Sequence, residues 1–260
     1  MGPSAGTALS FPGAVAARRR RLSFLHALGY PCRDECAGTG SGMVRRKEGP
    51  VKMLVTGFEP FGGEDRNPAQ EILSLLPRRR AGLSISTLVL PVVFGESAKR
   101  AGAAIRELAP AAVLMLGQAG GRPDVTVERV AINLDDARIQ DNRRKKPVDR
   151  PIDPAGPAAY FSTLPVRAIA DAIIAEGIPA SLSLSAGTFV CNHLLYSVLH
   201  QLSMKTPGVI AGFIHLPWLP GQAAEKKGQP SMGLELELAA VLAAIDAIGA
   251  WLAAPRAESR

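Results

Sequence analysis

Three side chains from separate parts of the sequence could together cleave an amide bond. Cys191 follows a predicted strand and a Gly-Thr turn, and it lies in the first turn of the predicted helix FVCNHLLYSVLHQL. The unpaired N–H groups and the positive end of the helix dipole at that position favour a thiolate. We therefore expect a lowered pKa for the Cys191 thiol, which could act as a nucleophile if a base lies beside it.

His215 is the histidine best placed to be that base. It follows the apolar run GVIAGFI, so it should stand at the carboxyl end of a buried strand, where open α/β sheets form their ligand crevice. His193 lies two positions after Cys191 on the same helix and points to the opposite side, and His200 is more than two turns away. Glu128, in the alternating segment VTVERVAIN, could orient the imidazole of His215 and stabilise its cation.

Each of these residues also has a simpler structural explanation. Free cysteine is among the most buried residue types, so Cys191 could belong to the core. A histidine such as His215 at a strand end could be a hydrogen-bonded structural residue, and Glu128 could pair with Arg122 or Arg129. A zinc site formed by Cys191, His193 and His215 would have poor tetrahedral geometry and no fourth ligand. Residue types alone therefore leave the catalytic and structural interpretations open.

Two glycine-rich segments resemble phosphate-binding loops only superficially. GFEPFGG at 57–63 lacks the Gly-Lys-Ser/Thr ending and the spacing of a dinucleotide fingerprint, and GQAGG at 117–121 has the same deficits. The first segment also inserts two phenylalanines, Phe58 and Phe61. Their rings fit a flat apolar ligand better than a phosphate, although core aromatics beside loop glycines would look the same.

The periodicity of apolar residues predicts the elements that must position these side chains. Strands are expected at 53–58, 84–92, 111–117, 125–134, 179–186 and 208–220. Helices are expected at 67–77, 95–110, 165–177, 189–202 and 232–254. Asn67 is the expected cap of the first helix, with proline at its first position.

Alternation of strands and helices predicts an α/β fold, a three-layer α/β/α sandwich with a largely parallel twisted central sheet. The segment 135–164 is rich in proline and charge and is expected to be a long loop, which in a compact domain is usually functional or mobile. No apolar run reaches the roughly 20 residues of a membrane span, so we expect no membrane contact.

The positive charge of the chain is concentrated at its N-terminus. Residues 1–52 hold nine Lys and Arg against three Asp and Glu, whereas residues 53–260 hold 21 against 20. We therefore expect a single catalytic domain at 53–260 that makes no electrostatic contact with nucleic acid. Residues 1–52 are interpreted as a disordered or mis-started extension, and a transit-like or twin-arginine-like signal is the alternative.

The cysteines indicate a reducing compartment. Cys32 and Cys36 lie in the extension, where they lack the second ligand pair of a metal site, and Cys191 has no thiol partner in the rest of the chain. A cytoplasmic location is the simplest expectation.

Several long motifs in register resemble the pyroglutamyl peptidase I family, cysteine peptidases also called pyrrolidone-carboxylate peptidases. The motifs are LVTGFEPFGG (54–63), GQAGGR (117–122), ERVAINLDDARIQDN (128–142), SAGTFVCNHLLY (185–196) and GFIHLPWLP (212–220). Together they run through nearly all of residues 53–254, which makes them far more specific than any single motif.

The resemblance assigns a role to each catalytic candidate. It implies that Cys191 is the nucleophile, His215 the base and Glu128 the acidic partner. It also implies an arginine near the oxyanion and an apolar pocket for the lactam ring. The matching substrate-binding residues are Phe58, Phe61, Gln118, Arg138, Ile139, Phe189 and Val190, with Gln118 contributing backbone near the lactam.

Three positions depart from the family pattern. Val92 stands where the pocket wall often has a small polar residue, Val127 replaces a frequent proline, and the segment 143–151 is unusually basic. These changes leave the catalytic residues intact and bear on the polarity of the pocket and the behaviour of the loop.

The resemblance implies removal of N-terminal pyroglutamyl (5-oxoprolyl) residues from peptides through an acyl-enzyme, with no metal or organic cofactor. It also implies a homotetramer. Two other functions stay open: a thiol-dependent amidase acting on another acyl group, and an inactive protein that binds lactams. The arginines of the extension could separately contact nucleic acid or a membrane.

Overall fold

The computed structural model describes residues 50–206 and 208–255. Most of the extension predicted at 1–52, including Cys32 and Cys36, lies outside these residues. The described chain begins its first strand at residue 51, two residues before the predicted start. Asn67 caps the first helix as predicted, because its side-chain oxygen accepts a hydrogen bond from the Ala69 N–H at 3.0 Å.

The described residues form a seven-stranded sheet in the order β2-β3-β1-β4-β9-β5-β8 and a separate two-stranded ribbon of β6 and β7. The strands are β1 (Val51–Phe58), β2 (Arg79–Arg80), β3 (Leu83–Leu90), β4 (Ala112–Gln118), β5 (Val125–Glu128), β6 (Val130–Ile132), β7 (Ala159–Phe161), β8 (Ala180–Ser183) and β9 (Ile210–Leu216). The helices are α1 (Pro68–Leu75), α2 (Glu96–Leu108), α3 (Val166–Ala175), α4 (Val190–Lys205), α5 (Pro220–Ala223) and α6 (Leu234–Ala253).

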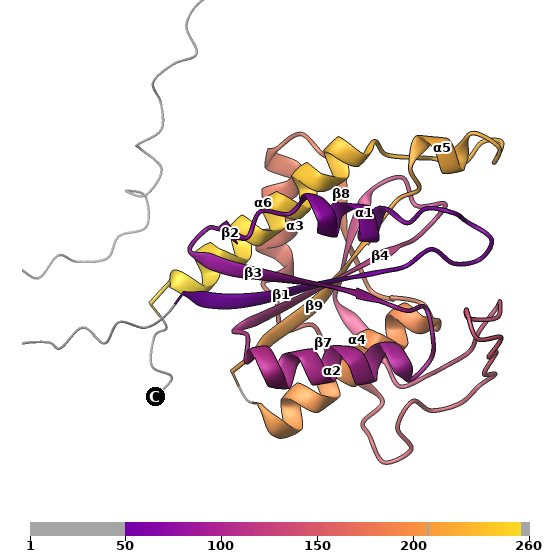
Figure 1. Ribbon diagram of the computed structural model, residues 1–260, viewed down its shortest axis with the longest axis horizontal. Coiled ribbons are helices and arrows are strands. Elements are labelled where there is room, and N and C mark those ends of the chain that lie inside the picture. The colour runs from indigo at the N-terminus through magenta and orange to yellow at the C-terminus, as the bar shows by residue number, and fades with distance from the viewer. Residues whose placement is uncertain (1–49, 207, 256–260) are drawn as a thin grey trace, which may run out of the picture. The chain divides into compact units, whose positions relative to one another are not determined.

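Helices cover both faces of the large sheet (Figure 1). One hydrophobic core lies under α1, α3 and α6 and includes Ile72, Ile169 and Ile245. The second lies under α2 and α4 and includes Phe58 and Phe213. The predicted three-layer α/β/α architecture is therefore confirmed.

The sheet is mixed rather than uniformly parallel. The strands β3, β1, β4 and β9 run parallel to one another. Strand β5 pairs antiparallel with β9 and parallel with β8. This reversal matters for the site, because antiparallel pairing brings the end of β5 back along β9. Glu128 faces the Phe213 position and Thr126 faces the His215 position.

The strand predicted at 125–134 and the loop predicted at 135–164 both need correction. The strand divides at Arg129, whose N–H donates to the Ser183 carbonyl and whose own carbonyl accepts from the Ser162 N–H. The chain thereby leaves the large sheet and continues as β6, which pairs with β7 from inside the predicted loop. Alternation of apolar residues reveals an extended chain but does not reveal the strand with which it pairs.

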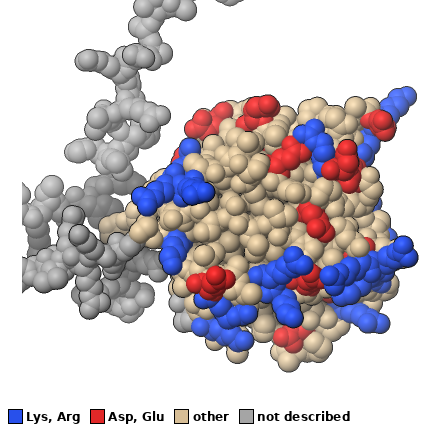
Figure 2. Space-filling view, in the orientation of Figure 1, with Lys and Arg blue, Asp and Glu red and all other residues tan. Residues whose placement is uncertain are grey.

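The surface carries both positive and negative side chains. Figure 2 shows lysine and arginine side chains interspersed with acidic ones and with broad uncharged areas on the face in view. This agrees with the near balance of 21 basic and 20 acidic residues at 53–260.

Helix α6 is the one helix in the described part of the chain that is long and apolar enough to cross a membrane by length and composition. Its buried residues, among them Val241, Ile245 and Ile248, belong to the hydrophobic core. It also carries Glu235 and Glu237 in its first turn. This arrangement is typical of a core helix.

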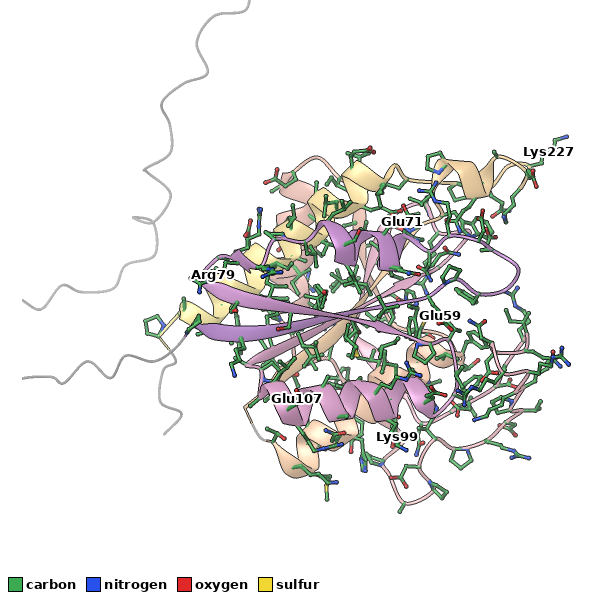
Figure 3. All side chains as sticks on the ribbon, viewed as in Figure 1. Glu59, Glu71, Arg79, Lys99, Glu107 and Lys227 are labelled. Atoms are coloured by element: carbon green, nitrogen blue, oxygen red, sulfur yellow. The ribbon has the colours of Figure 1, made fainter. Side chains whose placement is uncertain are left out.

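Glu237 on α6 is a buried carboxyl group with neither oxygen hydrogen-bonded. Burial, with a smaller contribution from the charge of Glu71 on α1 (labelled in Figure 3), raises its pKa to about 9. The folded protein therefore holds a proton here at neutral pH that the unfolded chain, with the ordinary value of 4.5, releases.

We expect Glu237 to make the protein less stable as the pH rises from 4.5 towards 9. Because the folded-state pKa is the higher one, the free energy of unfolding should fall by about 3 kcal/mol between pH 4.5 and 7 from this group. Glu237→Gln should flatten that dependence in chemical denaturation, while Glu235→Gln on the exposed side of the helix should not. Parallel stability curves for the wild type and Glu237→Gln would contradict the assignment.

Candidate active site

Cys191 lies in the first turn of α4 and packs against the end of β4. A Cβ atom built on Gly117 would stand 3.1 Å from the sulfur of Cys191 and 2.7 Å from the ring of Phe213. Gly117 is paired in register with His215 of the parallel strand β9, so the two positions face the same side of the sheet. The sulfur of Cys191 therefore lies against the strand position beside His215, at the carboxyl end of β4.

The imidazole of His215 is held by the carboxylate of Glu128. Nδ1 of His215 lies 2.7 Å from Oε1 of Glu128, and both residues are buried, at 4% and 0% exposure. A carboxylate can only accept a hydrogen bond, so Nδ1 carries the proton and Nε2 is left as the basic nitrogen. The reversed direction of β5 makes this contact possible, because Glu128 is the diagonal neighbour of His215 on the same face.

Arg122 completes the buried charge cluster. Its guanidinium lies 2.6 Å from Oε1 of Glu128 and also donates to Thr126 and to the Ser185 carbonyl. Burial alone would raise the pKa of the Glu128 carboxyl. The hydrogen bond and charge of His215, followed by hydrogen bonds from Ser183 and Arg122, outweigh burial and lower the pKa. Glu128 is therefore an anion. It contacts His215 and Arg122 at the same time, so the two partners that the sequence suggested do not exclude each other.

The expected lowering of the Cys191 pKa is wrong for this arrangement. Burial, assisted by the negative charge of Glu128, raises the pKa of the thiol to about 12, against the opposing effects of Arg122 and of backbone hydrogen bonding. The helix N-terminus does not overcome the loss of hydration. The residue is still partly exposed. A neutral thiol that passes its proton to His215 as it reacts fits this site better than a preformed thiolate.

The other histidines on α4 are structural. Nδ1 of His193 lies 2.9 Å from Oδ2 of Asp135, and its Nε2 accepts a hydrogen bond from the Gly95 N–H at 3.1 Å. His200, also on α4, has its Nδ1 atom 2.7 Å from the hydroxyl oxygen of Tyr160 on β7. His193 has no free ring nitrogen for the zinc site that the sequence left open, because both nitrogens already have partners.

Beside Cys191 and His215 lies a cavity of about 1030 Å³. Five of the predicted substrate-binding residues line it: Phe61, Gln118, Arg138, Ile139 and Phe189. The rings of Phe61 and Phe189 pack 6.0 Å apart between centroids and give it an apolar wall. Arg138 and Ile139 reach it from the loop that follows β6, where Ile139 is 38% exposed.

The other two predicted pocket residues lie behind the wall. Phe58 is 2% exposed with its ring 6.5 Å from that of Phe213, and Val190 is fully buried in the same core. Neither is among the residues that line the cavity. Val92, where the family pattern suggested a change in pocket polarity, is also buried and outside the lining.

Sequence reasoning missed a second part of the cavity wall, which includes Glu64, Trp218, Lys226 and Gln229. Trp218 could have been found, since it follows His215 by three residues in HLPWLP. Lys226 and Gln229 come from a polar segment after α5 that carries no recognisable pattern, and only the fold brings them here.

Known proteins resemble this chain over the same residues that build the site. The family model for pyroglutamyl peptidase matches residues 51–250. The pyrrolidone-carboxylate peptidase of Escherichia fergusonii is 56% identical over 184 residues, covering 70% of this chain and 86% of that protein. Pyrrolidone-carboxylate peptidase 1 of Caldanaerobacter subterraneus is 50% identical over 198 residues, covering 76% and 98%. The chain belongs to the pyroglutamyl peptidase family.

Solved pyroglutamyl peptidases share the fold. The crystal structure of pyroglutamyl peptidase I from Bacillus amyloliquefaciens matches with a TM-score of 0.75 and 42% identity, over 76% of this chain and 95% of that one. Pyrrolidone carboxyl peptidase from Thermococcus litoralis matches with the same TM-score of 0.75 and 38% identity, over 78% and 94%. The resemblance expected from the motifs is therefore confirmed.

In this member of the pyroglutamyl peptidase family, a buried glutamine joins three segments around the cavity. The side-chain amide of Gln222 on α5 donates to the side chain of Gln118 at 2.9 Å and to Glu64 at 3.1 Å. Its oxygen accepts from the Leu219 N–H. Gln222 thus fixes the side chain of Gln118, one of the residues that line the cavity.

Proposed function

We propose that this chain hydrolyses the bond after an N-terminal pyroglutamyl residue, with Cys191 as nucleophile, His215 as base and acid, and Glu128 as the group that orients His215. The observation that carries the proposal is the 2.7 Å contact between Glu128 and His215. The packing of Cys191 against Gly117, the register partner of His215, supports it, since both Cys191 and His215 line the cavity. Membership of the pyroglutamyl peptidase family supplies the substrate class.

The reaction proceeds through a thioester. Nε2 of His215 takes the proton of the Cys191 thiol as the sulfur bonds to the scissile carbonyl carbon. N–H groups at the start of α4, with Arg138, stabilise the oxyanion. The C–N bond then breaks and His215 returns the proton to the departing amine. Water activated by His215 attacks the thioester, which frees the pyroglutamate and restores the thiol.

The walls of the cavity select against ordinary N-termini. Phe61, Phe189 and Ile139 offer apolar surface to a compact uncharged lactam. A free α-ammonium would lose its hydration against those three apolar side chains, which is costly. Polar backbone near Gln118 can pair with the N–H and C=O of the lactam.

A panel of capped substrates tests the proposal. Pyroglutamyl-, prolyl- and glutaminyl-arylamides of the same reporter should separate clearly, and only the pyroglutamyl compound should release dye. Cleavage of the prolyl or glutaminyl compound at a similar rate would instead indicate another thiol-dependent amidase. Binding of free pyroglutamate by calorimetry without any turnover would indicate an inactive lactam-binding protein.

The proposal includes a cytoplasmic location and assembly into a homo-oligomer. The lone cysteine of the catalytic domain supports the location, because a free reactive thiol survives best in a reducing compartment. The assembly rests on the family resemblance, and sedimentation of the purified chain would establish its stoichiometry.

A further inference from the structure

The catalytic cavity has a second wall, formed around Trp218, that the lactam ring of the substrate does not contact. Phe61 and Phe189 pack against the core under α2 and α4. The backbone oxygen of Trp218, by contrast, accepts a hydrogen bond at 2.9 Å from Met232, which belongs to the core on the other face of the sheet. The cavity of about 1030 Å³ is thus lined by Phe61 and Phe189 and also by Trp218, whose backbone is bonded to a residue of the other core.

The indole of Trp218 is held firmly in place. A Cβ atom built on Gly120 would lie 2.0 Å from it, so the ring packs directly on a residue without a side chain. The ammonium of Lys226 lies 4.9 Å from the ring centroid. Lys226 is in turn held by Glu64 at 2.8 Å, which neutralises its charge. The wall is therefore a preformed aromatic surface with little net charge.

The strand register places this surface beyond the catalytic pair. Gly117 and His215 are paired, and a hydrogen bond of 2.8 Å from the Ala119 N–H to the Leu216 carbonyl keeps the two segments together past the paired residues. Three residues after His215 comes Trp218, and three residues after Gly117 comes Gly120. Both segments lead outward from Cys191 to the indole.

The chemistry determines which part of the substrate meets this surface. The departing nitrogen must lie at His215, because that residue supplies its proton. The lactam lies on the other side of the scissile carbon, against Phe61 and Phe189. The residue after pyroglutamate therefore starts at His215 and extends along the segment that ends at Trp218.

We propose that Trp218 forms a subsite for the side chain of the residue following pyroglutamate and favours an aromatic or large apolar side chain there. This inference rests on the proposed function. Because Glu64 neutralises Lys226, neither an acidic nor a basic side chain gains a new partner on this wall.

Peptides of equal length that differ only after pyroglutamate test the subsite. The wild type should have a kcat/KM about tenfold higher for a pyroglutamyl-phenylalanyl peptide than for a pyroglutamyl-alanyl peptide, the size of effect typical of one hydrophobic contact. Trp218→Ala should bring that ratio close to one, whereas Trp218→Phe should keep most of it. Gly120→Ala, which displaces the indole without removing it, should also lower the ratio.

Phe161→Ala is the matched aromatic control, since Phe161 is 71% exposed on β7 and does not line this cavity. It should leave the ratio at the wild-type value. A wild-type ratio near one, or an unchanged ratio in both Trp218→Ala and Gly120→Ala while both peptides are cleaved, would overturn the subsite alone. Failure of the wild type to cleave either peptide would overturn the proposed function and the subsite together.

Discussion

Replacement of Cys191 by alanine or serine should abolish hydrolysis of a pyroglutamyl-arylamide, with a loss on the order of 10⁴-fold or more. Alanine removes the attacking atom. Serine replaces it with a hydroxyl that is a far weaker nucleophile at neutral pH than sulfur. The side chain packs closely against Gly117, and both replacements are no larger than cysteine, so the fold should persist. Single-turnover and steady-state rates would measure the loss.

The matched control is the double variant Cys32→Ala/Cys36→Ala, which removes the other two cysteines of the chain and should keep wild-type activity. A thiol-alkylating agent should then inactivate this double variant as completely as the wild type. Substantial activity in Cys191→Ala, with circular dichroism unchanged, would remove Cys191 from the mechanism.

The second large effect is expected at Glu128. Glu128→Gln nearly preserves shape but can present an amide N–H to Nδ1 of His215, which favours the tautomer with the proton on Nε2 and removes the base. The corresponding change in a serine peptidase lowers kcat by about 10⁴, and a loss of that order is expected here. It should appear mainly in kcat, because Glu128 is fully buried and does not line the cavity.

Glu107→Gln on α2, labelled in Figure 3, is the matched control because Glu107 is exposed and remote from the cavity lining. It should leave kcat and KM unchanged. If Glu128→Gln raised KM and left kcat intact, Glu128 would instead shape the pocket. A loss confined to thermal stability would assign it a purely structural role with Arg122.

The catalytic candidates could be selected from the sequence because each breaks its local pattern. Glu128 is a carboxyl in an otherwise apolar alternation, and His215 closes an apolar run. Their contact could not be predicted in the same way. It depends on β5 running antiparallel to β9, and nothing in the period of the sequence distinguishes the two directions.

The pocket residues divide according to local geometry that motifs do not encode. Val190 follows Phe189 directly, yet the first turn of α4 points it into the core while Phe189 faces the cavity. Likewise, Phe58 is the last residue of β1 and packs inward, whereas Phe61 lies on the loop beyond it. Each motif contains both residues of such a pair, and only the backbone conformation determines which one faces the cavity and which one faces the core.

The direction of the Cys191 pKa shift was also beyond sequence reasoning. The helix N-terminus was visible in the pattern, but the extent of burial was not. Burial proved to be the larger effect. The balance between two opposing influences depends on packing, which only the assembled fold defines.

The glycines at the end of β4 have a consequence for enzyme redesign. Gly117 and Gly120 mark volumes already filled by Phe213, Cys191 and Trp218, so any side chain introduced there competes with the machinery itself. This edge of the sheet is closed to remodelling. Attempts to admit new acyl groups or to change leaving-group preference should start from exposed residues at the rim of the cavity, such as Ile139 and Gln229.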